Sequence, residues 1–152
     1  MKRLVVAFLV LVPLDFASAQ SMRVHFVNVG QGAATLFEFP CGCALVDSGG
    51  EKNSTFDSTQ ELLGYLDKFF EQRQDLHKTI DVMYLTHPHI DHTRGAPDVW
   101  ERYRVHNVVT NGSERPSSGS KQQNAIQAHV RDAEATEDKR DDVGFEGVHA
   151  DA

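Results

Sequence analysis

Three histidines and one aspartate lie within six consecutive positions near the middle of the chain: His87, His89, Asp91 and His92. Neutral imidazole and carboxylate are ligands of Zn²⁺ and related divalent ions. In an extended loop, residues i and i+2 point the same way, so His87 and His89 are placed to share one ion. Asp91 and His92 follow a change of direction and face a second ion. Ligands spread over two ions leave positions open for water, which is typical of a catalytic site.

The segments around this cluster favour a functional site over the alternative, a histidine-rich surface loop that binds metal adventitiously. Residues 80–85 are apolar at nearly every position, which predicts a strand buried between two layers. Pro88 prevents the chain from continuing as a regular strand, so the histidines are expected on a loop at the strand's carboxyl end. The buried strand would give that loop a rigid base.

The remaining pattern predicts a mixed arrangement of strands and helices. Further strands are expected at residues 22–29, 35–39, 43–46 and 105–110. The Ser58-Thr59-Gln60-Glu61 segment is a capping box that begins a helix running to about Arg73. Helices are also expected at residues 98–103 and 122–138. This order predicts an α/β (α+β) fold in which helices cover one side of the sheet.

The first 19 residues are typical of a secretory signal peptide. Lys2 and Arg3 precede the apolar run 4–14, and Ala17-Ser18-Ala19 is a small-x-small cleavage site. The apolar run is too short for the alternative, a membrane anchor, which needs about 20 residues. We therefore expect a secreted or periplasmic protein without a stable membrane anchor.

The net charge and the two cysteines exclude further classes of function. The formal net charge of −7 argues against tight nucleic-acid or anionic-membrane binding, although a nuclease could still contact phosphate through bound metal. Cys41 and Cys43 are separated by one glycine, and so short a loop would strain a disulfide. They are expected to be small residues at a hairpin rather than a redox or metal pair.

The His87-Pro88-His89-Ile90-Asp91-His92 segment resembles the HxHxDH motif of the metallo-β-lactamase-fold hydrolases. Residues 24–32 (VHFVNVGQG) and 46–50 (VDSGG) resemble the start of the metallo-β-lactamase-like domain of ComEC-type competence proteins and their secreted relatives. The resemblance covers about residues 22–112. It implies an αββα sandwich of two similar halves, with metal ions at one edge of the sheets.

The resemblance also implies roles for individual residues. His87 and His89 would bind the first metal ion, and Asp91 and His92 the second. Asp91 would also orient the nucleophile as the catalytic carboxylate, and Asp47 would orient the site. From the residues alone, Asp47 is equally well explained as a turn aspartate. The implied cofactor is Zn²⁺, two ions in the complete fold, with Mn²⁺ or Fe as alternatives.

The sequence departs from the family pattern in two respects. Ala33 stands where the family usually has an acidic residue, and the chain ends about where the second half of the fold should begin. We therefore expect a signal peptide at 1–19, the N-terminal half of a metallo-β-lactamase-like domain at 20–112, and a loop, a polar helix and an incomplete second half at 113–152. Self-association could then replace the missing half.

These observations predict a secreted metal-dependent hydrolase in which a metal-activated hydroxide attacks an ester-type bond, with a phosphodiester as the leading choice. The substrate would be a small molecule or a nucleic-acid-like ester. One alternative is hydrolysis of a β-lactam, lactone or thioester. Another is an inactive metal-binding fragment.

Overall fold

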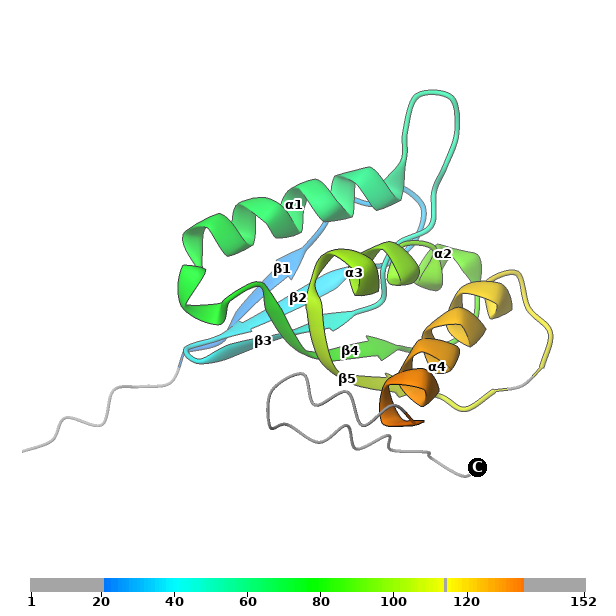
Figure 1. Cartoon of the computed structure of the whole chain (residues 1–152). Helices are drawn as coiled ribbons and strands as arrows, with labels where there is room; N and C mark the ends of the chain where they lie inside the picture. Colours follow the sequence, from blue (N-terminus) through cyan, green and yellow to red (C-terminus); the bar gives the residue numbers. More distant parts are fainter. Residues whose placement is uncertain (1–20, 114, 136–152) are drawn as a thin grey trace, which may run out of the picture.

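The computed structural model describes residues 21–113 and 115–135, and the predicted signal peptide lies outside them. One sheet with strand order β1-β2-β3-β4-β5 forms the centre of the described residues (Figure 1). The elements in chain order are β1 (Arg23–Phe26), β2 (Thr35–Phe39), β3 (Gly42–Val46), α1 (Ser58–Gln72), the 3-10 helix η1 (Gln74–Leu76), β4 (Thr79–Leu85), α2 (Ile90–Thr93), α3 (Ala96–Arg102), β5 (Arg104–Thr110) and α4 (Ser120–Ala135).

The sheet combines two kinds of pairing. Strands β1, β2 and β3 pair antiparallel, whereas β3, β4 and β5 pair parallel. Parallel neighbours need a crossover between them, and α1 supplies the first while α2 and α3 supply the second. The carboxyl ends of β3, β4 and β5 therefore meet at one edge of the sheet, which is where the histidine-rich segment follows β4.

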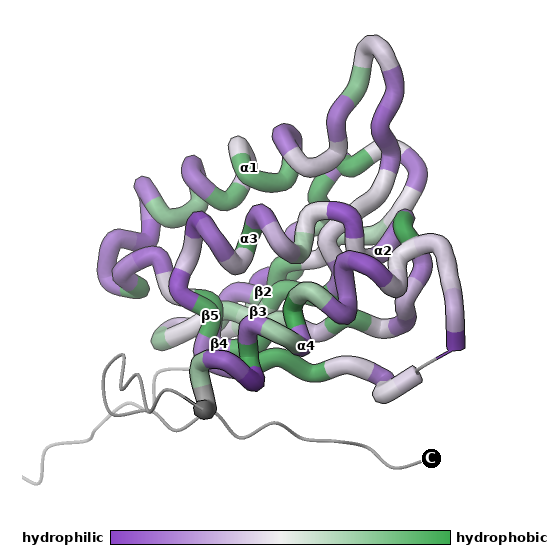
Figure 2. Tube along the Cα trace, turned by 45° about the vertical axis from the view of Figure 1, so that its right-hand side comes forward, coloured by the Kyte–Doolittle hydropathy of each residue, from purple (hydrophilic) through white to green (hydrophobic). Residues whose placement is uncertain are grey.

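Helices α1 and α3 cover one face of the sheet (Figure 1). Leu62 and Leu66 of α1 are fully buried, as are Leu36, Leu45 and Met83 of the central strands. Hydrophobic and hydrophilic stretches alternate along α1 (Figure 2), as expected for a helix with one buried face. Helix α4 packs against α2 and α3.

The opposite face of the sheet carries apolar side chains that the described residues leave partly open. Val24, Phe37, Ala44 and Val82 are neighbours in register and share this face. Phe26, two positions beyond Val24, is 83% exposed. Within the described residues, helices therefore cover only one of the two faces of the apolar 80–85 segment.

The predicted strands and longer helices all correspond to elements of the structure, but three details differ. Strand β1 is shorter than the predicted 22–29, and helix α2 forms where only a loop was expected, so that the prediction of a loop was wrong for Asp91 and His92. The third difference is the start of α1. Asp57, not Ser58, is the N-cap, because its extended backbone places its carboxylate to accept a hydrogen bond from the Thr59 amide at 3.0 Å. Ser58 is instead the first helical residue, and its buried hydroxyl has no hydrogen-bond partner among the residues that the structure describes. The capping-box prediction was therefore wrong by one residue.

Within residues 21–113 and 115–135, no helix has both the length and the apolar character that crossing a bilayer requires. The predicted helix at 122–138 corresponds to α4, and its last three residues lie outside the described part of the chain.

Candidate metal centre

The histidine-rich segment begins directly after β4, at the carboxyl edge of the sheet. His87 lies on the loop, His89 caps the short helix α2, and Asp91 and His92 lie within that helix. The sequence predicted a change of chain direction between His89 and Asp91, and helix α2 begins there. The position follows from sequence, since Pro88 ends regular strand structure and β4 is held between β3 and β5.

The side chains of this segment lie close together. The ring centroids of His87 and His89 are 4.6 Å apart, and those of His87 and His92 are 4.0 Å apart. Nε2 of His92 lies 3.6 Å from a carboxylate oxygen of Asp91. The structure thus brings together all four residues that the sequence predicted as ligands.

Asp47 connects the end of β3 to this cluster. Its side chain is buried, and Nδ1 of His92 lies 2.7 Å from Oδ2 of Asp47. The backbone amide and the hydroxyl of Thr86 also donate to Asp47, at 2.9 Å and 2.9–3.0 Å. Asp47 has a φ of 59°, a left-handed conformation that aspartate tolerates better than most residues. Asp47 therefore contacts both His92 and the residue that precedes the histidine-rich segment, Thr86.

Two glycine loops pack against the backbone of Asp91. A Cβ atom at Gly50 would overlap the Cα of Asp91, and one at Gly32 would overlap its carbonyl oxygen. The amide of Ala33 donates to that same carbonyl at 3.0 Å. Only residues without a side chain allow this approach, so Gly32 and Gly50 fix where Asp91 sits.

The loop that contains Ser48 and Gly49 also binds the next turn of the motif. The amide and the hydroxyl of Ser48 both donate to the carbonyl of His92, at 2.8 and 3.0 Å. The amide of Arg94 donates to the carbonyl of Gly49 at 3.1 Å, and its side chain donates to the carbonyl of Gly50. Helix α2 is thereby attached to the end of β3.

A third segment contacts the motif from much later in the chain. The amide of Gly119 donates to the carbonyl of Pro88 at 2.9 Å, and the amide of Ile90 donates to the hydroxyl of Ser118 at 3.1 Å. A Cβ at Gly119 would overlap Oγ1 of Thr93. Sequence reasoning missed this contact, because a Ser- and Gly-rich stretch predicts a loop but not what the loop packs against.

Other residues weighed from sequence lie away from the centre. His106 faces Asp81, with 3.7 Å between Nδ1 and Oδ1, and is not part of the cluster. Cys41 and Cys43 are both free thiols. Burial, reinforced by the nearby charge of Asp81, raises the pKa of Cys43 to about 12. A thiol that stays protonated is a poor metal ligand, which agrees with the structural role expected for Cys43.

The donor types of the cluster fit zinc, although the side chains do not converge as they stand. Imidazole and carboxylate are the appropriate ligands, and the use of Nδ1 of His92 by Asp47 leaves its Nε2 for an ion. Across the described residues, no three His, Cys, Asp or Glu side chains are arranged to hold a metal ion. Binding would therefore require some of these side chains to reorient.

Comparison with known proteins identifies the family of this chain. A family model described as the metallo-beta-lactamase superfamily matches residues 27–151. The match includes the histidine-rich segment, Asp47 and both glycine loops, and it continues beyond residue 112. A search of curated proteins finds no match to the chain.

Proposed function

Because this chain belongs to the metallo-beta-lactamase superfamily, we propose that it is a secreted, ComEC-like, zinc-dependent hydrolase of ester-type bonds, with phosphodiesters as the leading substrate class. The observation that carries the proposal is the cluster of His87, His89, Asp91 and His92 at the carboxyl end of β4. The attachment of His92 to the buried Asp47 supports it.

His87 and His89 would hold one ion, and Asp91 and His92 the other. Bound divalent ions of this kind act as Lewis acids and supply hydroxide at neutral pH. The protein's own contribution begins with Asp47, whose contact with Nδ1 of His92 fixes the ring orientation and directs Nε2 toward the ion. Thr86 fixes Asp47 in turn through two donated hydrogen bonds.

The proposed ComEC-like specificity rests on the two glycine segments, residues 24–32 and 46–50. Gly32 and Gly50, one from each segment, pack against Asp91. The segments that resemble ComEC-type proteins are therefore parts of the candidate site itself rather than distant scaffold. The acidic net charge of the chain favours a small ester or a short nucleic-acid-like substrate, bound through metal, over a long polyanion.

Metal binding and hydrolysis provide the test. We expect the mature chain to bind zinc or manganese and to hydrolyse bis-p-nitrophenyl phosphate faster than a chromogenic cephalosporin or a lactone. His89→Ala and Asp91→Ala should lower the metal stoichiometry, and hydrolysis should fall by more than about 100-fold, beyond the cost of losing an outer hydrogen bond. His106→Ala is the matched control and should change neither quantity.

The outcomes separate the competing functions. Equal loss of metal in all three variants would show non-specific binding and would contradict the assignment. Preference for the cephalosporin or the lactone would replace the phosphodiester by the second substrate class. Specific metal binding without turnover of any substrate would identify an inactive metal-binding protein.

Export is tested separately. The proposed signal peptide predicts that protein recovered from the periplasm or the medium begins at Gln20, immediately after the Ala17-Ser18-Ala19 cleavage site. N-terminal sequencing measures this directly. An exported, membrane-bound form that retains Met1 would indicate an anchor instead.

A further inference from the structure

A second cluster of titratable side chains lies at the opposite end of the sheet from the candidate metal centre. Glu38 pairs with Arg23 at the start of β1 and with Cys43 near the start of β3. The histidine-rich segment follows the carboxyl end of β4, which runs parallel to β3. The length of the strands therefore separates the two clusters.

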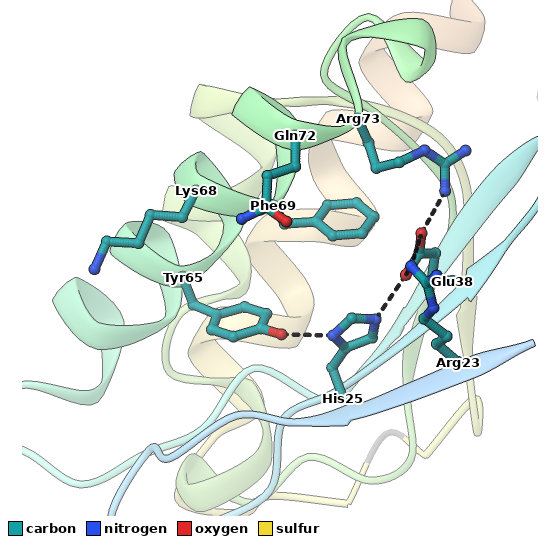
Figure 3. A pocket seen from close by; sticks show the side chains of 8 residues that line it. All are labelled: Arg23, His25, Glu38, Tyr65, Lys68, Phe69, Gln72 and Arg73. Carbon is teal, nitrogen blue, oxygen red and sulfur yellow. Dashed lines mark hydrogen bonds and ion pairs between the residues drawn. The ribbon is translucent and has the colours of Figure 1, made fainter.

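A cavity of about 370 Å³ accompanies this second cluster, between strands β1 and β2 and the second half of α1 (Figure 3). Arg23, His25 and Glu38 line it from the strands, and Tyr65, Phe69 and Arg73 line it from the helix and its end. The volume falls at the lower end of the range for small-molecule sites.

Glu38 has no capacity left for a ligand. The residue is 7% exposed, and its carboxylate accepts hydrogen bonds from Arg73 at 2.7 Å, His25 at 3.0 Å and Arg23 at 3.4 Å. Burial alone would raise the pKa of Glu38, but the bonds from Arg73 and His25 outweigh it and hold the pKa below its usual value. Glu38 is therefore an ionised group that the protein itself neutralises.

Arg73 is also fully committed to the protein. Its guanidinium donates to Glu38, to both carboxylate oxygens of Asp75 and to the carbonyls of Phe39 and Pro40. A guanidinium has five N–H donors, so these five bonds use all of them. Arg73 attaches the end of α1 to the β2–β3 hairpin and is not available to a ligand.

The charged groups at the cavity that keep donors for a ligand are two cations, and Gln72 adds a neutral amide to the lining. The side chain of Arg23 is 74% exposed and contacts Glu38 through one nitrogen only, at 3.4 Å. The exposed Lys68 also lines the cavity, and its ammonium group has donors alone. The rings of Tyr65 and Phe69 supply an apolar part of the lining next to His25, and the Lys68 side chain is directed away from Arg23 (Figure 3).

We propose that this cavity binds a small organic anion, whose carboxylate or phosphate meets Arg23 while its apolar body lies against Tyr65 and Phe69. The anion would accept hydrogen bonds from the guanidinium N–H groups of Arg23 that Glu38 does not use. Arginine forms short, charge-assisted hydrogen bonds with both carboxylates and phosphates. The site is distinct from the candidate metal centre and does not depend on it.

The proposal is tested on the full chain after metal ions have been removed with a chelator and the chelator has been dialysed away, so that neither a metal ion nor the chelator can compete for the probe. Benzoate and phenyl phosphate are the anionic probes, and benzamide is their neutral counterpart. We expect both anions to bind at least about tenfold more tightly than benzamide in calorimetric titrations, as one charged hydrogen bond accounts for that difference. Ring resonances of His25 and Tyr65 should shift on binding.

Variants locate the site. Arg23→Gln should weaken both anions by about tenfold, and its circular dichroism should match the wild type because this side chain is exposed. Lys121→Gln, at an exposed position on α4, is the matched control and should leave binding unchanged. The stronger of the two probes then identifies whether carboxylate or phosphate is the preferred group.

Three outcomes would overturn the proposal. Equal affinity for benzamide and benzoate would show that charge plays no part. Unchanged binding by Arg23→Gln would remove its central contact. Loss of binding in Asp91→Ala would place the anion at the histidine-rich segment instead.

Discussion

Each end of the sheet contains a histidine paired with a buried carboxylate, but the two histidines differ in how many of their ring nitrogens have partners. His92 contacts the buried Asp47 at 2.7 Å, and His25 contacts the buried Glu38 at 3.0 Å. The second nitrogen of His25 is also occupied, because Nδ1 lies 2.6 Å from the hydroxyl of Tyr65. Among residues 21–113 and 115–135, Nε2 of His92 has only the carboxylate of Asp91 near it, at 3.6 Å. A histidine with one ring nitrogen hydrogen-bonded can still bind an ion through the other nitrogen. A histidine with both ring nitrogens hydrogen-bonded has a structural role.

The two ends also differ in what holds them. Around Asp91 the supporting contacts come from backbone groups and glycines, which leaves the imidazole and carboxylate side chains available. Around Glu38 the support comes from side chains, above all the five bonds of Arg73. Substitutions at the first end should therefore affect metal-dependent hydrolysis most, and those of Glu38 or Arg73 at the second end should affect stability.

Gly50→Ala should have the largest effect. Its Cβ would overlap the Cα of Asp91, and backbone cannot move aside as a flexible side chain can. We expect metal-dependent hydrolysis to fall by more than about 100-fold, as for a misplaced reacting group, together with about 1–3 kcal/mol of lost stability. Activity assays and urea denaturation measure the two effects. Wild-type activity in this variant would show that the position of Asp91 is not critical.

Asp47→Asn should weaken metal binding by about 10- to 100-fold, because the residue that orients His92 loses its charge. Asparagine tolerates the left-handed backbone at this position, so the fold should persist. Competition titration with a zinc chelator measures the affinity. Glu38→Gln, which alters the equivalent carboxylate at the other end, serves as the control and should keep wild-type affinity.

Glu38→Gln should instead lower the free energy of unfolding at pH 7 by about 1–3 kcal/mol, the range for a buried group that loses charged hydrogen bonds. The folded-state pKa of Glu38 is lowered, so its contribution is present above the pKa of about 4.3 in the unfolded chain and disappears as pH falls through the folded value. Urea denaturation at pH 7, 5 and 3.5 should show the difference between variant and wild type shrinking below pH 4.3. A constant difference would contradict the role of the charge.

Gly64→Ala should have the smallest effect and the opposite sign. Gly64 is exposed in the middle of α1, and a Cβ there would meet no atom within 4 Å. Alanine in a helix interior is about 1 kcal/mol more favourable than glycine, so thermal denaturation should show a slightly more stable protein with unchanged metal binding. Destabilisation would indicate a contact on this side of α1.

Local patterns in the sequence predicted most of the elements and the proximity of the histidines and Asp91 to one another. The alternation of apolar and polar residues predicted the strand at 35–39. Pro88 predicted that a loop follows β4. His87, His89, Asp91 and His92 are close in sequence, so their proximity in space needed no knowledge of the fold.

Local sequence patterns could not predict the contacts between segments that are distant in the chain. The partners of Glu38 depend on how α1 docks on β1 and β2, because Arg73 is 35 positions away in the chain. The contact of Gly119 with Pro88 likewise depends on the path of the chain after β5. At the start of α1, Asp57 and Ser58 are both good N-caps by type, and the backbone conformation of Asp57 decides between them.

The attachment of the histidine-rich segment to β3 has a kinetic consequence. The bonds from Thr86 and His92 to Asp47 close loops of 39 and 45 residues, and contacts of such long range form only after much chain entropy has been lost. We therefore expect the metal centre to be completed after the folding transition state, once α1 and β4 have joined the sheet. An ion bound there would lengthen the lifetime of the native protein and leave its refolding rate almost unchanged.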